Sequence, residues 1–360
     1  MNTLFTCAAI LLATAAAAQD TLPKENPPLV ISGYAEGYYS FDLNKPADNN
    51  KPGFLYSYNR HNEFNLNMGY IKAAYSKDRV RGNLALAAGT YINANYAAEP
   101  GVLKNIFEAN AGYRISKNKN IWFDMGIMSS HIGFESAIGK DCWTLTRSLV
   151  AENSPYFESG AKLSYTSNNG KLAVSALALN GWQRITRVSG NSLMSWGTQV
   201  TAKPNDRITL NYSTFMGTDK PDSTRLWRLY HNLYGIFQFS KKIGLIAGFD
   251  IGTEQKIKGS NDKNTWLSPV GILRYTPSEK WALALRGEYF DDEHGVIIAS
   301  GTPNGFKTTG VSLNIDYMPA ANMVLRLEGR SLNSKDAVFT KNGSPEKNNT
   351  TITMAMAISL

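Results

Sequence analysis

Segments in which apolar and polar residues alternate recur from residue 31 to the last residue of this chain. The last ten residues, TITMAMAISL, show the pattern clearly: Ile352, Met354, Met356, Ile358 and Leu360 are apolar, and the residues between them are small or hydroxylated. A period of two indicates a β-strand with two different faces. Chain ends are usually frayed and polar, so a strand that reaches the last residue must be paired. We expect it to pair with the first strand and close a barrel without a free edge.

Sixteen alternating segments are predicted as strands, each about as long as a tilted strand that crosses a bilayer. They cover residues 31–43, 62–75, 79–91, 105–116, 120–130, 155–167, 171–183, 193–203, 207–217, 226–240, 242–255, 265–276, 280–292, 306–318, 322–333 and 349–360. No apolar run after the first 18 residues approaches the length of a transmembrane helix. The predicted fold class is therefore all-β, as a transmembrane antiparallel up-and-down barrel.

The connections between these segments alternate between short and long. The short turns are residues 76–78, 117–119, 168–170, 203–206, 241–242, 277–279 and 319–321. The long loops are residues 44–61, 92–104, 131–154, 184–192, 218–225, 256–264, 293–305 and 334–348. This sorting is expected of an outer-membrane barrel, in which the periplasmic rim carries short turns and the extracellular rim carries long loops.

Side-chain parity agrees with a barrel but does not require one. In KWALALRGEYFDD (280–292), Leu283 and Leu285 lie on one face, and Arg286 and Glu288 lie on the other. A water-soluble sandwich would show the same alternation, because it buries its apolar face. Aromatic residues help to separate the two, since several lie beside short turns, as an aromatic girdle at the membrane interface requires. These are Tyr75, Tyr165, Phe239, Tyr275, Trp281 and Tyr317.

The amino-terminal residues read as an export signal. Residues 4–18 are almost entirely apolar, and Ala16, Ala17 and Ala18 before Gln19 fit a cleavage site, although no Lys or Arg precedes the stretch. A membrane anchor is the alternative, but it would need about 20 apolar residues. We therefore predict a signal peptide at 1–18, a Pro-containing periplasmic leader at 19–30 and a barrel domain at 31–360. Cys142 is then the single cysteine of the mature chain, which excludes an intramolecular disulfide.

Charge and motifs exclude several function classes. The formal net charge is +8, but the Lys and Arg residues are scattered, so no nucleic-acid partner is expected. The chain contains no G-x-S-x-G and no H-E-x-x-H, and its four histidines show no metal-ligand spacing. We expect no enzymatic activity, no metal and no cofactor.

Several stretches resemble a known family. Among them are GYAEGYYSFDLN, NEFNLNMGYIKAAYSKDRV, ESAIGKDCWTLTRSLVAENSPYFESGAKLSY and ALALNGWQRI. They are similar to the outer-membrane β-barrel porins of the OmpL-like type, which are common in Bacteroidetes. The resemblance covers residue 31 to the end and implies a Gram-negative outer-membrane location. It also implies an aqueous channel for passive diffusion of small hydrophilic solutes or ions, with membrane lipid and the barrel-assembly machinery as partners. Porins of this size are frequently homotrimers. Leu360 departs from the aromatic residue on which outer-membrane proteins commonly end.

A barrel of sixteen strands is too wide for side chains to fill, so charged inward-facing residues should line a water-filled lumen. Parity places the following candidates there: Arg79, Arg81, Arg114, Asp124, Arg274, Arg286, Glu288, Arg326, Glu328 and Arg330. Because their strands lie two apart, Arg286 and Glu288 are expected to form a ladder with Arg326, Glu328 and Arg330. Parity places further charged residues on the lumen face, and with them positive and negative charges nearly balance, so strong ion selectivity is not expected. These residues are Lys162, Arg228, Glu36, Asp42, Glu63, Glu108, Glu158, Asp250, Glu254 and Asp316.

The longest loop, 131–154, is the candidate constriction. If it folds inward, Glu135, Lys140, Asp141 and Arg147 create a transverse electric field, and deletion of residues 136–146 should raise the conductance. The alternative is an ordinary surface loop. Two other functions stay open at this point: a barrel that only anchors loops for binding or adhesion, and a soluble exported β-protein.

Overall fold

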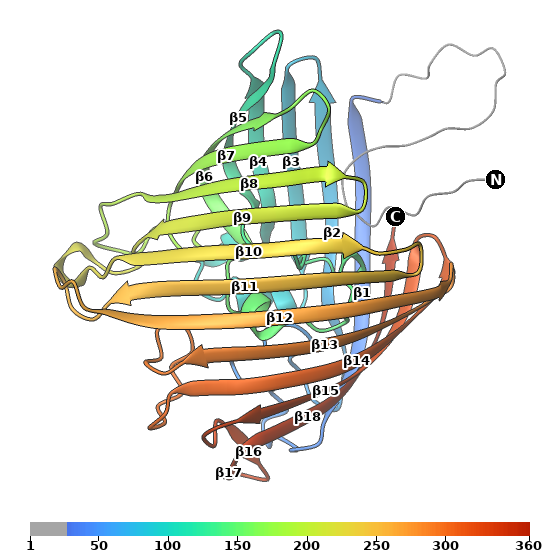
Figure 1. The fold of residues 1–360 in the computed structure, drawn as a ribbon, viewed down its shortest axis with the longest axis vertical. Coiled ribbons are helices and arrows are strands. Elements are labelled where there is room, and N and C mark those ends of the chain that lie inside the picture. The colour runs from blue at the N-terminus through green and yellow to red at the C-terminus, as the bar shows by residue number, and fades with distance from the viewer. Residues whose placement is uncertain (1–26) are drawn as a thin grey trace.

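The computed structural model describes residues 27–360. The predicted signal peptide lies outside the described residues, as does most of the predicted leader. Sixteen of the described strands form one closed antiparallel barrel, in the order β1-β18-β15-β14-β13-β12-β11-β10-β9-β8-β7-β6-β5-β4-β3-β2 (Figure 1). Their bounds are β1 (Leu29–Asp42), β2 (Phe64–Lys77), β3 (Val80–Ala88), β4 (Ile106–Arg114), β5 (Asn120–Ser129), β6 (Phe157–Thr166), β7 (Leu172–Leu179), β8 (Ser195–Asn205), β9 (Ile208–Gly217), β10 (Arg228–Gln238), β11 (Ile243–Gln255), β12 (Lys263–Ser278), β13 (Trp281–Asp292), β14 (Phe306–Ala320), β15 (Met323–Ser334) and β18 (Asn348–Ser359).

The predicted closure of the barrel is confirmed. β18 pairs antiparallel with β1 on one side, in a register that sets Met356 opposite Gly37, and with β15 on the other. Each of the sixteen predicted strands is present, with ends shifted by a few residues. Strands β16 (Phe339–Lys341) and β17 (Ser344–Glu346) form a separate hairpin in the loop before β18.

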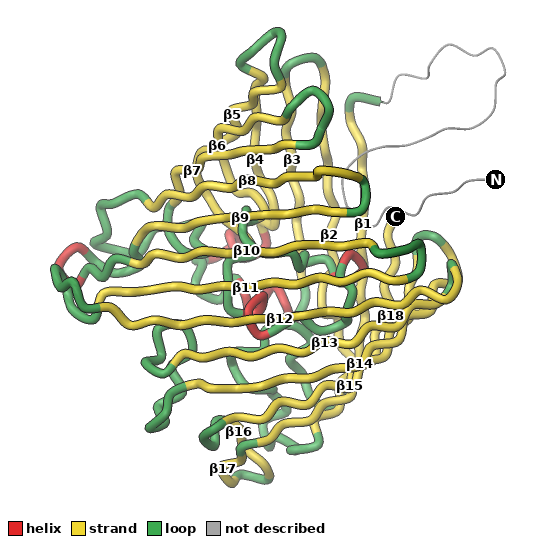
Figure 2. The backbone as a smooth tube through the Cα atoms, in the orientation of Figure 1, coloured by secondary structure: helices red, strands yellow, loops and turns green. Residues whose placement is uncertain are grey.

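Short turns and long loops gather at opposite rims of the barrel. In Figure 1, the turns that join β8 to β9, β10 to β11 and β12 to β13 lie on the right, as does the carboxyl terminus, and the long loops lie on the left. Several helical turns interrupt the long loops: α1 (Thr90–Asn95), η1 (Gly101–Asn105), η2 (Gly139–Asp141), α2 (Leu149–Glu152) and η3 (Asp222–Thr224). Figure 2 shows helices and loops behind the front strands, within the outline of the barrel.

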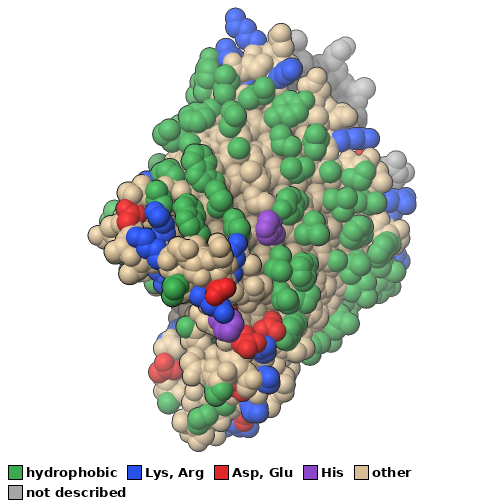
Figure 3. Space-filling model, turned by 60° about the vertical axis from the view of Figure 1, so that its left-hand side comes forward, with side chains coloured by type: hydrophobic (Ala, Val, Ile, Leu, Met, Phe, Trp, Pro, Cys, Tyr) green, Lys and Arg blue, Asp and Glu red, His purple; other side chains and the backbone are tan. Residues whose placement is uncertain are grey.

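The outer surface carries the apolar side chains. Leu285 is 50% exposed, Leu313 is 53% exposed and Met354 is 44% exposed, whereas Thr353 of the inner face is 1% exposed. Figure 3 shows hydrophobic side chains spread over the strands of one outer face. Aromatic residues lie beside the short turns, where the ring of Trp281 is 4.7 Å from that of Tyr317. An exposed apolar band with aromatic residues at its edge fits contact with lipid. None of the described helices is long and apolar enough to cross a membrane.

A charge placed on this band should destabilise the barrel in lipid. Leu313 lies at the middle of β14 on the outer face. Leu313→Arg should lower the free energy of unfolding in lipid vesicles by about 2–4 kcal/mol, because a guanidinium near the bilayer midplane loses hydration. Ile257, which is 68% exposed in the loop between β11 and β12, gives the matched control. Ile257→Arg should change the unfolding free energy little, and equal effects of the two variants would argue against lipid contact at Leu313.

Candidate pore constriction

Loop 131–154 lies inside the barrel and is fastened to the inner faces of β13 and β15. The backbone N–H of Thr146 donates to Glu328 Oε2 over 2.6 Å. The N–H of Leu149 donates to Glu288 Oε2 over 2.6 Å. Both carboxylates point inward because they alternate with outward-facing residues along their strands. Hydrogen bonds to ionised groups are about twice as strong as neutral ones, so these carboxylates are firm anchors for the loop.

The wall behind the loop carries a ladder of four charges, Arg286, Glu288, Glu328 and Arg330. Arg286 Nη2 lies 2.9 Å from Glu328 Oε1, and Arg330 Nη2 lies 2.7 Å from Glu288 Oε1. These pairs link β13 to β15 across β14, where Ser312 lies directly opposite both Arg286 and Arg330. A small residue at this position leaves room for the long side chains to meet. Four of the five residues of the predicted ladder are therefore joined by direct ion pairs, whereas the fifth, Arg326, pairs with Asp316 instead.

A second anchor holds the deepest part of the loop. Arg326 makes a bidentate pair with Asp316, with 2.7 Å from Nε to Oδ1 and 3.1 Å from Nη2 to Oδ2. Its guanidinium also donates to the carbonyls of Gly139 over 2.6 Å and Cys142 over 2.9 Å. Gly139 lies so close to the Glu36 carboxylate that an added Cβ would collide with it. Any larger residue at position 139 would therefore force the Glu36 side chain of β1 to move.

Arg147, a predicted constriction residue, is enclosed by loop 131–154 and bonds to the backbone of that loop. Its side chain is fully buried, and its guanidinium donates to the carbonyls of Ser136 over 2.7 Å, Leu145 over 2.7 Å and Ala137 over 3.0 Å. The three bonds tie the descending and ascending limbs of the loop together. The structure therefore places this cation within the loop and not at its surface.

Glu135 is also buried within the loop. Its carboxylate accepts hydrogen bonds from the backbone N–H and the hydroxyl of Ser148, the residue that caps α2. Burial raises the pKa of Glu135, although Arg286, with Nη1 at 4.0 Å from Oε1, acts in the opposite direction. The contact with Ser148 also brings the two ends of the segment 136–147 together.

Lys140 and Asp141, the other two predicted constriction residues, form the tip of the loop. Asp141 is exposed and Lys140 is half-buried. The ammonium of Lys140 donates to Ser359 Oγ over 3.2 Å, and its backbone N–H donates to the hydroxyl of Tyr34 over 3.3 Å. Ser359 ends β18 at the short-turn rim, so the loop spans most of the height of the barrel. The tip places one positive and one negative side chain side by side at the edge of the lumen.

The opposite wall, formed by β2–β8, keeps much of its inner polar surface accessible. Lys72 pairs with Glu108 over 2.6 Å, and Arg81 pairs with Asp124 over 2.5 Å. The guanidinium of Arg81 also lies 4.2 Å from the centre of the Trp122 ring. The inner side chains of this wall toward the short-turn rim are mostly half-exposed, whereas those of β13, β15 and β18 are buried. Loop 131–154 therefore covers the side of the lumen formed by β13, β15 and β18, while the part of the β2–β8 wall toward the short-turn rim stays accessible.

The remaining predicted lumen residues lie near the short-turn rim. Arg79 is in the turn between β2 and β3, not on a strand, and donates to the carbonyls of Arg114 and Ile115. Arg114 is half-buried at the end of β4. Arg274 is on the inner face of β12, with its guanidinium 5.7 Å from the ring centre of Trp143 in the loop.

Comparison with known proteins identifies the family. The model of the family described as "Putative beta-barrel porin-2, OmpL-like" matches residues 28–360. This chain belongs to the OmpL-like porin family. The predicted resemblance is thus confirmed, and the protein is an outer-membrane channel protein of the porin type. No curated protein matches the chain.

Solved structures show that the porin shares its fold with distant proteins. An anion-selective porin from Comamonas acidovorans has a TM-score of 0.61 at 10% identity, covering 92% of this chain and 99% of that chain. Outer-membrane expressed OmpT of Vibrio cholerae has a TM-score of 0.60 at 11% identity, covering 92% and 97%. The outer membrane channel DcaP of Acinetobacter baumannii has a TM-score of 0.56 at 12% identity, also covering 92% and 97%.

Two further loops of the porin enter the lumen, and neither inward fold is predicted by the sequence pattern. In the loop between β1 and β2, the side chain of Tyr58 is fully buried. The backbone of this loop bends sharply at Lys45, where φ is 53°, and at Tyr58, where φ is 51°. In the loop between β3 and β4, Tyr91 and Ile92 of α1 are fully buried. Large aromatic residues in the middle of long, otherwise polar loops are the signal that could have indicated burial.

His131 fastens the base of loop 131–154 to the wall. Its Nδ1 is 2.8 Å from Glu158 Oε1, and its Nε2 is 2.8 Å from the carbonyl oxygen of Thr214. A carbonyl and a carboxylate only accept hydrogen bonds, so both ring nitrogens donate and the imidazole is charged. Burial acts to lower the pKa of His131, and so does nearby Lys162, but the charge and hydrogen bonds of Glu158 raise it further, for a net increase.

The raised pKa makes the stability of the porin pH-dependent. The contribution of His131 is fully present below its ordinary pKa of 6.5 and is lost as the pH rises through the raised pKa of the folded state. In His131→Gln this part of the pH dependence should disappear from thermal unfolding curves in detergent. His294→Gln, at an exposed loop position, should keep the wild-type profile. Identical pH profiles for wild type and His131→Gln would contradict a charged His131.

Proposed function

We propose that small hydrophilic solutes and ions diffuse passively through this porin along the β2–β8 wall, past the tip of loop 131–154. The observation that supports this route is the asymmetry of the lumen. Wall residues behind the loop are buried and paired, whereas side chains such as Lys72, Asn110 and Lys162 on the other wall stay half-exposed. Polar groups that remain in contact with water can replace part of the hydration of a passing solute. The proposal includes no enzymatic reaction.

The charges along this route favour weak ion selectivity. Lys72 is neutralised by Glu108 and Arg81 by Asp124, and at the tip Lys140 lies beside Asp141. A pore with paired charges should discriminate by size more strongly than by sign. In a salt gradient across a planar bilayer, we expect a reversal potential close to zero.

Size selection tests the proposal. Proteoliposomes that contain the porin should swell rapidly in pentoses and hexoses and more slowly as neutral oligosaccharides grow longer, because loop 131–154 narrows the lumen. Proteoliposomes that contain a similar amount of folded porin with no uptake of any solute would contradict the route. That result would favour the alternative of a barrel that anchors its loops for binding or adhesion.

We also propose that the porin assembles as a homotrimer. A structure of OmpT from Vibrio cholerae in its trimer form shares the fold, with a TM-score of 0.58 at 10% identity. The exposed apolar band supplies a surface on which copies in the same membrane can pack. Native mass spectrometry of the porin in mild detergent should report three chains, and a purely monomeric spectrum would reject the assembly.

A further inference from the structure

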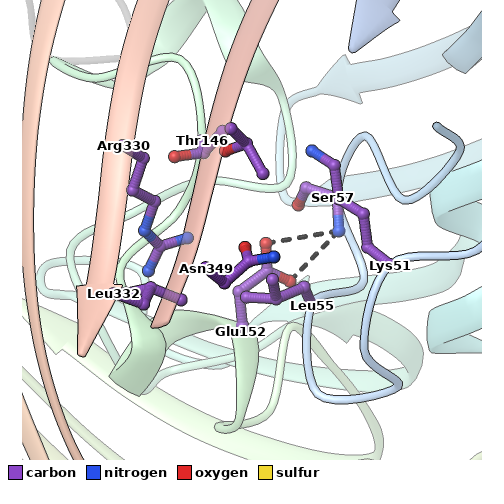
Figure 4. Close-up of a pocket in the computed structure, with 9 residues that line it drawn as sticks. Lys51, Leu55, Ser57, Thr146, Glu152, Arg330, Leu332 and Asn349 are labelled. Atoms are coloured by element: carbon purple, nitrogen blue, oxygen red, sulfur yellow. Dashed lines mark hydrogen bonds between the residues drawn. The ribbon is translucent and has the colours of Figure 1, made fainter. Parts of the chain in front are cut away.

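The pocket between the loop that joins β1 to β2 and strands β15 and β18, on the covered side of the lumen, is too small for a solute (Figure 4). It has room for about one water molecule. Two of its lining residues are joined by hydrogen bonds of 3.2 Å from the backbone N–H of Ser57 to both carboxylate oxygens of Glu152, as the dashed lines in Figure 4 show. This pocket is therefore closed to solutes, and contact with them is left to the surfaces that border open water.

Four apolar side chains border the open lumen at the inner face of β10 and β11. Phe134 and Trp143 come from loop 131–154, and Tyr234 and Ile236 come from β10. All four are half-buried, although the inner face of a membrane barrel is usually polar. Apolar side chains that stay in contact with water indicate a surface for ligands with an apolar face. We call these four residues the apolar strip.

Two glycines of β11 let the rings of the loop lie close against the wall. A Cβ added at Gly248 would lie 2.9 Å from Phe134 Cε1, and one added at Gly244 would lie 2.6 Å from Trp143 Cη2. Both glycines are on the inner face of β11. Because part of each ring rests on the strand and each side chain is only half-buried, the accessible part of each ring is turned to the lumen.

The apolar strip runs along the barrel wall toward the short-turn rim. Gly248 and Gly244 are four residues apart on one strand, which corresponds to about 13 Å. At the upper end the rings of Phe134 and Tyr234 meet edge to face, with 5.6 Å between their centres. The strip therefore offers aromatic surfaces over a length suited to a mono- or disaccharide.

Hydrogen-bonding groups stand at the edge of the strip. Among the described residues the hydroxyl of Tyr234 has no hydrogen-bond partner, and it is not enclosed. The guanidinium of Arg274 on β12 lies 5.7 Å from the centre of the Trp143 ring, where it is held by a cation–π contact. Aromatic surfaces with donors beside them fit a pyranose, because its C–H groups form an apolar face and its hydroxyls lie around the rim.

We propose that the apolar strip is a binding subsite for neutral pyranose sugars that enter the porin. The C–H face of the sugar packs on the rings of Phe134 and Trp143, and its hydroxyls bond to Tyr234 and Arg274. The subsite rests on the proposed channel function, since it selects among the solutes of that channel. Binding itself does not require that the barrel conduct, so the two proposals can fail separately.

Block of the ionic current tests the subsite in a planar bilayer. Methyl β-glucoside should reduce the wild-type current with a saturable dependence on its concentration. Sorbitol, an acyclic neutral polyol of similar size, should lower the current only as far as it raises the viscosity of the solution. Equal block by the two solutes in a conducting porin would overturn the subsite and leave the channel in place. Saturable block by benzoate without block by the glucoside would also overturn it, in favour of a site for aromatic acids.

Matched substitutions separate ring packing from a general change of the loop. Trp143→Phe keeps a planar ring and should bind the glucoside nearly as well as wild type. Trp143→Leu keeps an apolar side chain without a flat face and should bind about three- to tenfold more weakly. Phe134→Leu should show the same loss, and it serves if Trp143→Leu does not fold. Trp281→Leu, on the outer face, should respond like wild type. Wild-type affinity in both Leu variants of loop 131–154 would contradict the subsite.

Saturation-transfer NMR on the detergent-solubilised porin gives a measurement that does not depend on conduction. Irradiation of aromatic protons in the wild type should transfer saturation to the ring C–H protons of methyl β-glucoside, with much less transfer to sorbitol. Transfer should be weaker in Trp143→Leu. No transfer to the glucoside, or equal transfer in wild type and Trp143→Leu, would overturn the subsite even if the porin conducts. Transfer without any current in bilayers would retain the subsite and reject the channel.

Discussion

Replacement of residues 136–147 by a short Gly-Ser linker should raise the single-channel conductance several-fold. The segment covers the inner faces of β13 and β15, and its removal exposes that side of the lumen to water. The linker can be short because the side chain of Glu135 already contacts Ser148. Arg147 is removed with the segment, since its three carbonyl partners belong to residues 136, 137 and 145. A deletion limited to 136–146 would leave this buried guanidinium without them.

A matched loop replacement separates this effect from a general loosening of the barrel. Residues 257–261, in the loop between β11 and β12, are exposed or half-exposed, and the same linker there should leave the conductance unchanged. If the 136–147 variant conducts like the wild type while both proteins are folded, loop 131–154 does not limit the current.

Arg286→Met should cause the largest loss of stability among single substitutions in the wall. Arg286 is fully buried and contacts Glu328 at 2.9 Å, Glu288 at 3.3 Å and the carbonyl of Thr146 at 2.6 Å. Without the guanidinium, two buried carboxylates lose a cation and loop 131–154 loses an anchor. We expect the free energy of unfolding to fall by about 3–5 kcal/mol, as when one partner of a buried ion pair is removed. The temperature of the heat-modifiable gel shift should fall with it.

Two further variants show whether the loss comes from the unpaired charge. Glu328→Gln added to Arg286→Met should recover part of the stability, because the uncompensated carboxylate is gone. Lys203→Met, at an exposed position near the end of β8, should change the unfolding free energy by no more than about 0.5 kcal/mol. Arg286→Met with wild-type stability would mean that the ladder does not hold the wall and the loop together.

The strands of this porin could be predicted because their pattern is local. Ile352, Met354 and Met356 face outward and Thr353 faces inward simply because successive side chains of a strand alternate. Turn residues then fixed the order of the pairings. The observed β3 begins one residue after the predicted start of that strand. Arg79 therefore falls in a turn and not on the wall.

The constriction could be predicted only in part, because it depends on contacts between segments far apart in the chain. Loop length singled out residues 131–154, and parity singled out Arg286, Glu328 and Arg326. Nothing local indicates that Arg147 is enclosed by three carbonyls of its own loop, since an exposed arginine has the same sequence signature. The inward folding of the loop around Tyr58 and of α1 depends in the same way on the space left inside the closed barrel.

Ion current through the wild-type porin in a planar bilayer is the most direct test of a lipid-facing barrel around a wet, partly covered lumen. Such a barrel should give stepwise current increments for the wild type that are smaller than those of the 136–147 linker variant. Bilayers that stay silent with both proteins, after heat-modifiable migration has verified that each is folded, would contradict it.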